Sequence, residues 1–254
     1  MALFIVSAAA LSGCSAPGKA PDSNSVPQVQ SDTASGAAAF TTPRERLSLE
    51  AEASPEWVTR LDAAKDAKQL FVVAGYENST AWISMHEKDA GGSWKMILST
   101  PGYIGREGLG KTREGDAKTP VGTFSFNKAF GLADDPGCAL PYTKADEDIY
   151  WSGDENINYN QMVNIKDHPE LDTDKSEHIV DYKYQYQYCL NISYNEEGKA
   201  NAGSAIFLHC FGDKKPYTGG CIAIPEEQMY YVMQHVDPGC VVVIDSMKGL
   251  GAEF

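Results

Sequence analysis

The stretch AIFLHCFGDKKPYTGGCIAIP, residues 205–225, joins two short apolar runs through a polar loop. The first run ends in His209, and Gly219 and Gly220 lead into Cys221 at the start of the second. This pattern predicts strand, loop and strand, with the histidine and the cysteine at adjoining strand ends. A histidine within hydrogen-bond reach can take the proton of a thiol, whose ordinary pKa is about 8.5, and give a thiolate–imidazolium pair.

The two glycines before the cysteine give the loop a second property. Glycine adopts positive φ without a steric penalty, so Gly219 and Gly220 can let the backbone approach a substrate closely. The amide N–H groups of Gly220 and Cys221 can then donate to a carbonyl oxygen that becomes negative during attack. We predict acyl transfer through a thioester, with Cys221 as nucleophile and His209 as general base. The spacing alone leaves open a buried structural cysteine beside a glycine turn.

A second motif lies upstream, in the segment GDAKTPVGTF at residues 115–124. Together with His209 and Thr218-Gly219-Gly220-Cys221-Ile222, it resembles the L,D-transpeptidase (YkuD-type) catalytic domain over roughly residues 69–245. The resemblance implies a mainly β fold, an L,D-transpeptidase-like β-sandwich with a few short helices. It also implies a cysteine that attacks a peptidoglycan stem peptide, releases a terminal D-amino acid and passes the acyl group to an amine. We expect no cofactor.

The resemblance also assigns roles to residues of the loop. It gives Cys221 as nucleophile, His209 as general base, Gly220 as oxyanion donor, and Thr218 and Gly219 as substrate-binding residues. Many members carry a histidine two residues before the cysteine and an Arg or Asn two residues after it, where this chain has Gly219 and Ala223. The second ring nitrogen of His209 needs an acceptor to fix its tautomer. Since no carboxylate lies at a suitable spacing, we expect a backbone carbonyl there, that of Cys210.

Residues 140–194, between the two motifs, are rich in aromatic and acidic side chains. An aromatic wall over the cysteine can hold an extended peptide, so we include Tyr142 and Trp151 in the predicted substrate-binding set. His178 joins this set because it can contact the peptide carboxylate. The alternative is that most of these aromatics fill the core or cover its edge.

Short runs rich in β-branched and aromatic residues, separated by turn residues, predict strands. The predicted strands cover residues 69–75, 80–87, 94–100 and 123–126. One helix is predicted over residues 225–235, since Pro225 suits a first turn and Glu226 and Glu227 complement the helix dipole. We divide the chain into a signal segment, a flexible tether, a short helical lead-in and a catalytic domain. These are residues 1–14, 15–42, 43–68 and 69–254.

The N-terminal residues predict the cellular location of the protein. Residues 1–11 are apolar and run into Leu11-Ser12-Gly13-Cys14, which resembles a bacterial lipobox whose cysteine is lipidated. No Lys or Arg precedes the apolar run, which departs from that pattern. Residues 15–42 are dominated by small and polar residues, as in a tether. We therefore expect an extracytoplasmic lipoprotein of the cell envelope, held at the membrane by a lipid anchor at Cys14.

Charge narrows the range of partners. The 254-residue chain carries 35 acidic and 21 basic side chains, a net charge of −14. Such a surface repels phosphate backbones, which argues against nucleic acid as a partner. The family resemblance implies peptidoglycan stem peptides as the partner. Asp167-His168 and Asp172-Thr173-Asp174 lack a complete ligand spacing, so we predict no metal site.

The sequence leaves several alternatives open. Water in place of the amine gives an L,D-carboxypeptidase, and a lipoprotein that binds peptidoglycan without chemistry is a further possibility. A papain-like hydrolase is disfavoured because its cysteine usually precedes its histidine. Four further cysteines are even in number, and export permits disulfides, but their pairing does not follow from sequence. These are Cys138, Cys189, Cys210 and Cys240.

Overall fold

The computed structural model describes residues 49–212 and 215–252. Cys14 and the predicted tether lie outside the described residues. The strands are β1 Glu52–Ala53, β2 Gln69–Gly75, β3 Thr80–Lys88, β4 Trp94–Tyr103, β5 Gly122–Gly131, β6 Tyr142–Lys144, β7 Ile149–Trp151, β8 Met162–Asn164, β9 Glu177–His178, β10 Cys189–Ile192, β11 Phe207–Cys210, β12 Ile222–Ile224 and β13 Val241–Ser246. The α-helices are α1 Glu56–Thr59, α2 Glu226–His235 and α3 Met247–Leu250, and the 3-10 helices are η1 Asp62–Ala64, η2 Ile179–Asp181 and η3 Gln185–Gln187.

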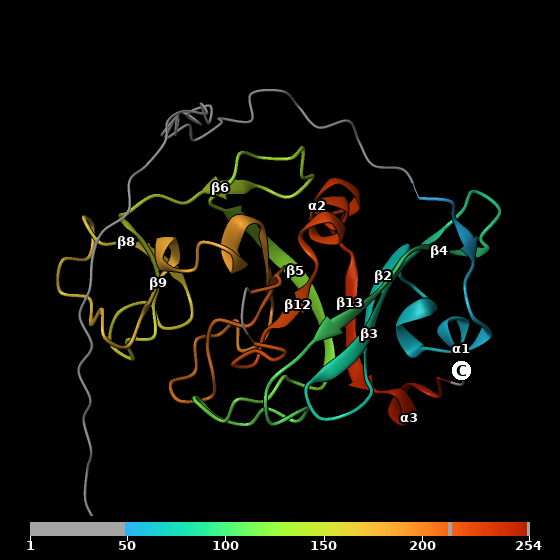
Figure 1. Cartoon of the computed structure of the whole chain (residues 1–254), viewed down its shortest axis with the longest axis horizontal. Coiled ribbons are helices and arrows are strands. Elements are labelled where there is room, and N and C mark those ends of the chain that lie inside the picture. The colour runs from blue at the N-terminus through green and yellow to red at the C-terminus, as the bar shows by residue number, and fades with distance from the viewer. Residues whose placement is uncertain (1–48, 213–214, 253–254) are drawn as a thin grey trace, which may run out of the picture. The chain divides into compact units, whose positions relative to one another are not determined.

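Ten of the described strands form one sheet that closes on itself (Figure 1). Its order is β1-β4-β12-β11-β10-β5-β13-β2-β3, with β6 added beside β5. Because β3 also pairs with β4, the strands from β4 to β3 close into a ring, with β1 added beside β4, and the sheet becomes a barrel-like sandwich. Most neighbours are antiparallel, but β11 pairs with β12 in parallel, as do β2 with β13 and β5 with β6.

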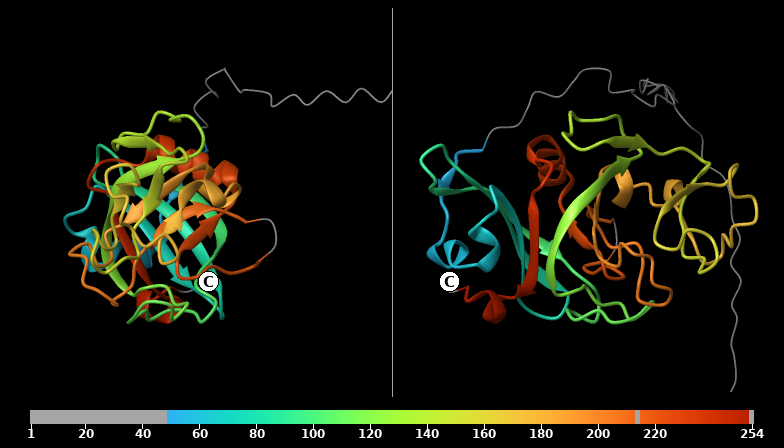
Figure 2. Two further views of the ribbon diagram at one scale, coloured as in Figure 1. Left: turned by 90° about the vertical axis from the view of Figure 1, so that its left-hand side faces the viewer. Right: turned by 180° about the vertical axis from the view of Figure 1, so that it is seen from behind.

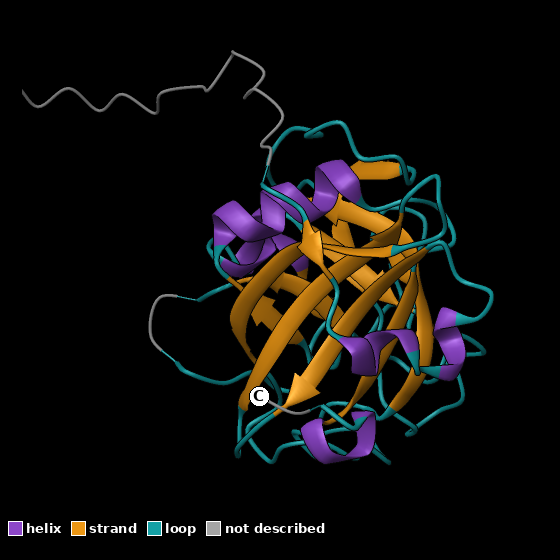
Figure 3. Ribbon diagram, turned by 90° about the vertical axis from the view of Figure 1, so that its right-hand side faces the viewer, coloured by secondary structure: helices purple, strands orange, loops and turns teal. Residues whose placement is uncertain are grey.

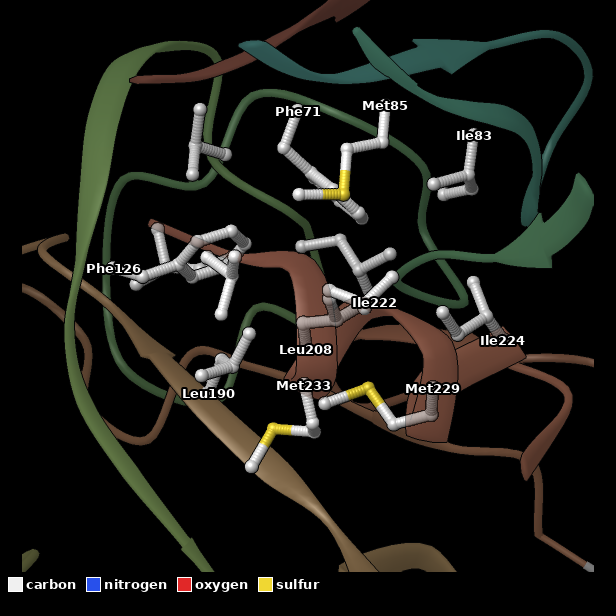
Figure 4. Packing of buried hydrophobic residues seen from close by; sticks show 14 of the residues in the cluster. Phe71, Ile83, Met85, Phe126, Leu190, Leu208, Ile222, Ile224, Met229 and Met233 are labelled. Carbon is white, nitrogen blue, oxygen red and sulfur yellow. The ribbon is translucent and has the colours of Figure 1, made fainter. Parts of the chain in front are cut away.

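Side chains that point into the closed sheet form the main core. Figure 4 shows Phe71, Met85, Leu208 and Ile222 converging between the strands. The long helix α2 adds Met229 and Met233 to this cluster from its buried face. The predicted helix is therefore confirmed, with Pro225 as its N-cap and two glutamates in its first turn.

The outer face of β2 is also buried, which explains why this strand is apolar at consecutive positions. Leu70 and Val72 point to the opposite face from Phe71, as the alternation of a strand requires. They pack against Trp57 and Val58 of α1. The lead-in segment thus covers one face of the sheet, and Figure 3 shows the short helices lying against the strands.

A small sheet of order β8-β7-β9 is built by the insertion between the two motifs. It lies on the opposite side of the barrel from α1 (Figures 1 and 2). The four predicted strands are all found, with β4 and β5 extending beyond the predicted ends. The prediction of a mainly β sandwich with a few short helices is confirmed. Among the described residues, no helix has the length and apolar character needed to cross a membrane.

Candidate active site

The parallel pair β11 and β12 brings the histidine and the cysteine to one face of the sheet. Leu208 is paired with Ile222, and both belong to the main core. Since side chains alternate along a strand, His209 and Cys221 point to the other face. The amide of Phe207 lies 3.4 Å from Cys221 Sγ and holds the sulfur against β11.

A cavity of about 870 Å³ opens over this face. Its walls combine the end of β4 and the loop after it, the insertion, and the loop that precedes the cysteine. Residues that line it include Tyr103, Arg106, Lys111, Glu114, Glu155, Lys175, Glu177, Tyr182, Tyr186, His209, Lys215, Tyr217, Thr218, Gly219, Cys221 and Ala223. Acidic and basic side chains face the same space.

Cys221 is a neutral thiol in this setting. Its Sγ donates to the carbonyl oxygen of Ala205 at 3.1 Å. Burial raises the pKa of Cys221 to about 12, and the negative charge of Glu177 adds to this rise. The positive charge of Lys111 acts in the opposite direction but is outweighed. The thiolate expected from sequence is therefore not the resting form.

His209 is held as a neutral imidazole. Its Nδ1 lies 2.7 Å from the carbonyl oxygen of Cys210, the partner predicted from sequence. Because a carbonyl only accepts, Nδ1 carries the proton and Nε2 keeps its lone pair. Burial lowers the pKa of His209 to about 4, against the raising effect of the Cys210 carbonyl. With both groups neutral, proton transfer has to accompany attack on a substrate.

The glycine pair divides into one strained and one free position. Gly220 has φ 147°, and a Cβ there would lie 2.9 Å from the carbonyl oxygen of Lys118 and 3.1 Å from Ile206 Cδ1. Gly219 is not among the positive-φ residues, and a Cβ there would meet no atom within 4 Å. The close approach predicted for both glycines is thus imposed on Gly220 alone.

Thr218 orders the loop around the cysteine. Its hydroxyl donates to the carbonyl oxygen of Cys221 at 2.6 Å and accepts from the amide of Gly220 at 3.1 Å. The Gly220 amide, predicted as an oxyanion donor, is therefore engaged within the loop in this structure.

The upstream motif forms hydrogen bonds with the loop that precedes Cys221. The Thr119 hydroxyl donates to the carbonyl oxygen of Gly220 at 2.7 Å and accepts from the amide of Gly105 at 2.8 Å. A bridge also joins Gly105 to Thr218. One buried hydroxyl thus links the residues after β4, the upstream motif and the loop before Cys221. The upstream motif therefore stabilises the conformation of that loop.

Asp116 fixes the conformation of the same motif. Burial acts to raise the pKa of Asp116, but backbone amides of Thr112, Lys118 and Arg113, together with Lys111, bring it down to about 2. Lys111 Nζ lies 3.1 Å from Asp116 Oδ1, and both side chains are nearly fully buried. The lysine of the Gly-Lys-Thr sequence at this position therefore forms a structural ion pair beside the loop.

Three residues of the predicted substrate-binding set lie away from the cavity. Tyr142 donates to the carbonyl oxygen of Ala133 and packs against the main core. Trp151 is buried against Phe130 and donates to Asn160 Oδ1 at 3.0 Å. Both side chains therefore lie in or against the core, which is the alternative that the sequence analysis left open for these aromatics.

His178 also lies away from the cavity, on the other face of β9. It stacks on Tyr150 with ring centroids 4.3 Å apart, and its Nε2 lies 2.9 Å from the carbonyl oxygen of Glu147. Cys221, His209, Thr218 and Gly219, in contrast, line one space.

Sequence reasoning missed Glu177, the neighbour of His178. Glu177 lines the cavity, and its Oε2 accepts a 2.5 Å hydrogen bond from the Tyr186 hydroxyl. An acidic residue within an aromatic segment gave no signal of its own. Only the pairing of β7 with β9 turns Glu177 toward the cysteine and His178 away from it.

The described residues hold no group of three His, Cys, Asp or Glu side chains that could bind a metal ion. Their cysteines are free thiols, at positions 138, 189, 210, 221 and 240.

Comparisons with known proteins give the family of the chain. The family model for the YkuD L,D-transpeptidase catalytic domain matches residues 65–244. No curated protein matches the chain.

Solved structures with a similar fold include the helical cell shape determining protein Pgp2 from Campylobacter jejuni, at 16% identity and a TM-score of 0.39 over 75% of this chain and 54% of that one. The Ldtfm-avibactam carbamoyl enzyme is 17% identical, with a TM-score of 0.32 over 70% of this chain and 49% of that one. An L,D-transpeptidase from Mycobacterium smegmatis is 12% identical, with a TM-score of 0.31 over 70% of this chain and 59% of that one. The chain thus spans about half the length of these proteins.

The family match covers the cysteine, the histidine and the upstream motif that braces them, and most of the described barrel. The chain belongs to the YkuD family of L,D-transpeptidase catalytic domains.

Proposed function

We propose that the chain is a cysteine-dependent L,D-transpeptidase that transfers a peptidoglycan stem peptide to an amine. The observation that carries this proposal is the placement of Cys221 and His209 on one face of the sheet, in one cavity, beside a loop that only glycine can form at residue 220. The family match supports the substrate class.

In the proposed acylation, Cys221 Sγ attacks the carbonyl carbon before the terminal D-amino acid. His209 Nε2 takes the thiol proton as the C–S bond forms, because neither group is charged beforehand. The Cys221 amide is the first oxyanion donor that we propose. The Gly220 amide becomes the second only when the Thr218 hydroxyl releases it. The imidazolium then protonates the departing amine.

Two alternatives compete with this proposal. Water in place of the amine makes the protein an L,D-carboxypeptidase, and loss of chemistry makes it a peptidoglycan-binding protein. A disaccharide-tetrapeptide incubated with an amine acceptor separates all three by mass spectrometry. Transfer gives the cross-linked product, hydrolysis gives only the shortened peptide, and binding alone gives neither.

The same experiment tests the nucleophile. Cys221→Ala should remove both products and the trapped acyl-enzyme, which would form with a carbapenem-type acylating agent on the native protein. Cys240→Ala is the matched control, because that buried thiol packs in the main core and does not line the cavity. Label on Cys240, or normal turnover by Cys221→Ala, would overturn the proposal.

We also propose that the protein is a lipoprotein anchored through Cys14 and acts outside the cytoplasm. The lipobox-like residues before Cys14 motivate this proposal. Intact-mass analysis of the protein purified from membranes should show a chain that begins at Cys14 and carries acyl groups. An unmodified N-terminus with the apolar residues still attached would refute the anchor without touching the catalytic proposal.

A further inference from the structure

The register between β7 and β9 in the small sheet determines which way the Glu177 side chain points. Glu177 is paired with Trp151 across β7 and β9, and directly opposed residues of an antiparallel pair project to the same face. Trp151 packs in the cluster that contains Cys221 and Phe207. Glu177 is thereby aimed at the space over the cysteine.

Only one oxygen of the Glu177 carboxylate has a hydrogen-bond partner among the described residues. Its Oε2 accepts from the Tyr186 hydroxyl at 2.5 Å, and the Tyr186 ring lies edge-on to His209 at 5.5 Å. In the described part of the chain, Oε1 has neither a hydrogen bond nor an ion pair. Two lysines that line the same cavity are engaged elsewhere, Lys111 with Asp116 and Lys175 with Asp172.

An unpaired carboxylate in such a place is costly when charged. Burial raises the pKa of Glu177 to about 7; the Tyr186 hydrogen bond opposes the rise, and the charge of Glu114 adds to it. The carboxylate also raises the pKa of Cys221. A cationic ligand at Oε1 would relieve both effects.

We propose that Glu177 is the site that binds the ammonium group of the acceptor and takes its first proton beside the thioester. This inference rests on the proposed transferase function and names the acceptor as a primary alkylamine. It gives the enzyme a reason to prefer an amine over water, because the amine is drawn to the carboxylate and arrives there in its unreactive protonated form.

The protons balance as follows. The bound ammonium gives one proton to Glu177, and the freed lone pair attacks the thioester carbon. The C–N bond forms and the C–S bond breaks, so that sulfur leaves with its electron pair. The second proton of the nitrogen goes to His209 Nε2. The products are an amide, a Cys221 thiolate paired with imidazolium, and a neutral Glu177 that returns its proton to water.

The test compares two acceptors on the full chain acylated by a tetrapeptide stem. One is the side-chain amine of Nα-acetyl-lysine, which is an ammonium at neutral pH, and the other is hydroxylamine, which is uncharged there. Glu177→Gln should lower the rate of transfer to the lysine amine by roughly 10²-fold. Transfer to hydroxylamine should stay near its native value. The rate of acylation should not fall, because loss of the Glu177 charge lowers the pKa of Cys221. Glu170→Gln, which removes the same charge from an exposed position outside the cavity, should alter both acceptors little.

Tyr186→Phe gives a second, independent measurement. Because the Tyr186 hydrogen bond lowers the pKa of Glu177, its removal should raise that pKa, and transfer to the lysine amine should then begin at higher pH. The hydroxylamine profile should not move with it. Other titratable or charged groups lining the cavity are Tyr103, Arg106, Lys111, Glu114, Glu155, Tyr159, Lys175, Tyr182, His209, Lys215, Tyr217 and Cys221. A shift shared by both acceptors would assign the change to one of these groups.

Equal losses with both acceptors in Glu177→Gln would reduce Glu177 to a structural role and overturn the inference. So would an unchanged lysine rate. If Glu177→Gln fails to fold, the Tyr186→Phe profile decides alone. Failure of the native protein to form any acyl-enzyme would instead refute the proposed function, which keeps the two failures distinct.

Discussion

At the scale of single residues, burial controls the ionisation of the proposed catalytic pair. Both Cys221 and His209 lie in a space that disfavours charge, so the thiol holds its proton tightly and the imidazole accepts one reluctantly. A cysteine of ordinary pKa would ionise unaided only a little above neutral pH. In this cavity the histidine is needed even in moderately alkaline solution.

His209→Ala should therefore respond to pH differently from a variant with an ordinary free thiol. Since burial holds the pKa of Cys221 near 12, the rate of its alkylation by iodoacetamide should rise about tenfold per pH unit from pH 7 to 10. The native protein should show a shallower dependence. The measurement is the rate of carbamidomethylation of the Cys221 peptide. A plateau near pH 8.5 would mean that the thiol is not desolvated.

At the scale of elements, the loop before Cys221 acts as one unit with the upstream motif. Thr119 holds Gly220 from one side, and the Thr218 hydroxyl holds it from the other. Positive φ at Gly220 turns the chain so that Cys221 can follow directly into β12. The precision of the nucleophile is therefore set by hydrogen bonds between segments about a hundred residues apart in sequence.

Gly220→Ala and Gly219→Ala form a matched pair that tests this view. At Gly220 the added Cβ meets a backbone carbonyl at 2.9 Å in a backbone conformation that side chains rarely adopt. We expect that variant to lose about 1–3 kcal/mol of stability and most of its acylation rate. Gly219→Ala has open space and should keep both. Urea unfolding and single-turnover acylation are the two measurements, and equal behaviour of the two variants would contradict the assignment.

At the scale of the whole described domain, side chains are buried on the outer face of the closed sheet as well as inside it. The main core fills the closed sheet, and a second cluster lies between the outer face of β2 and the lead-in helix α1. His86 reinforces this contact, since its Nδ1 lies 2.9 Å from the hydroxyl of Ser54 in the lead-in. The lead-in thus packs as part of the folded domain.

Trp57→Ala measures what this packing contributes. Trp57 is 8% exposed and fills the second cluster, so its truncation should lower the free energy of unfolding by about 3–5 kcal/mol. The rate of Cys221 acylation at a temperature where the variant is folded should stay unchanged, because Trp57 does not line the cavity. Leu49→Ala, at a side chain that is 51% exposed, is the control. If Trp57→Ala loses no more unfolding free energy than Leu49→Ala, the lead-in contributes little to the packing of the domain.

The sequence by itself determined several of the strands, the helix α2 and the family. Apolar runs bounded by turn residues were enough for β2, β3, β4 and β5, because local propensity and the tertiary fold agree there. The partner of His209 Nδ1 could also be predicted, since the adjacent carbonyl of Cys210 is the acceptor that needs no distant residue.

Only the tertiary structure decided which residues face the cysteine and in what ionisation state. Glu177 and His178 are neighbours in sequence, yet the register of β9 on β7 sends one toward the cavity and the other onto Tyr150. That register is set by long-range strand pairing, and a slip of one residue would exchange them. The pKa of Cys221 likewise depends on how many atoms of other segments exclude water from it. Spacing along a chain carries no information about either quantity.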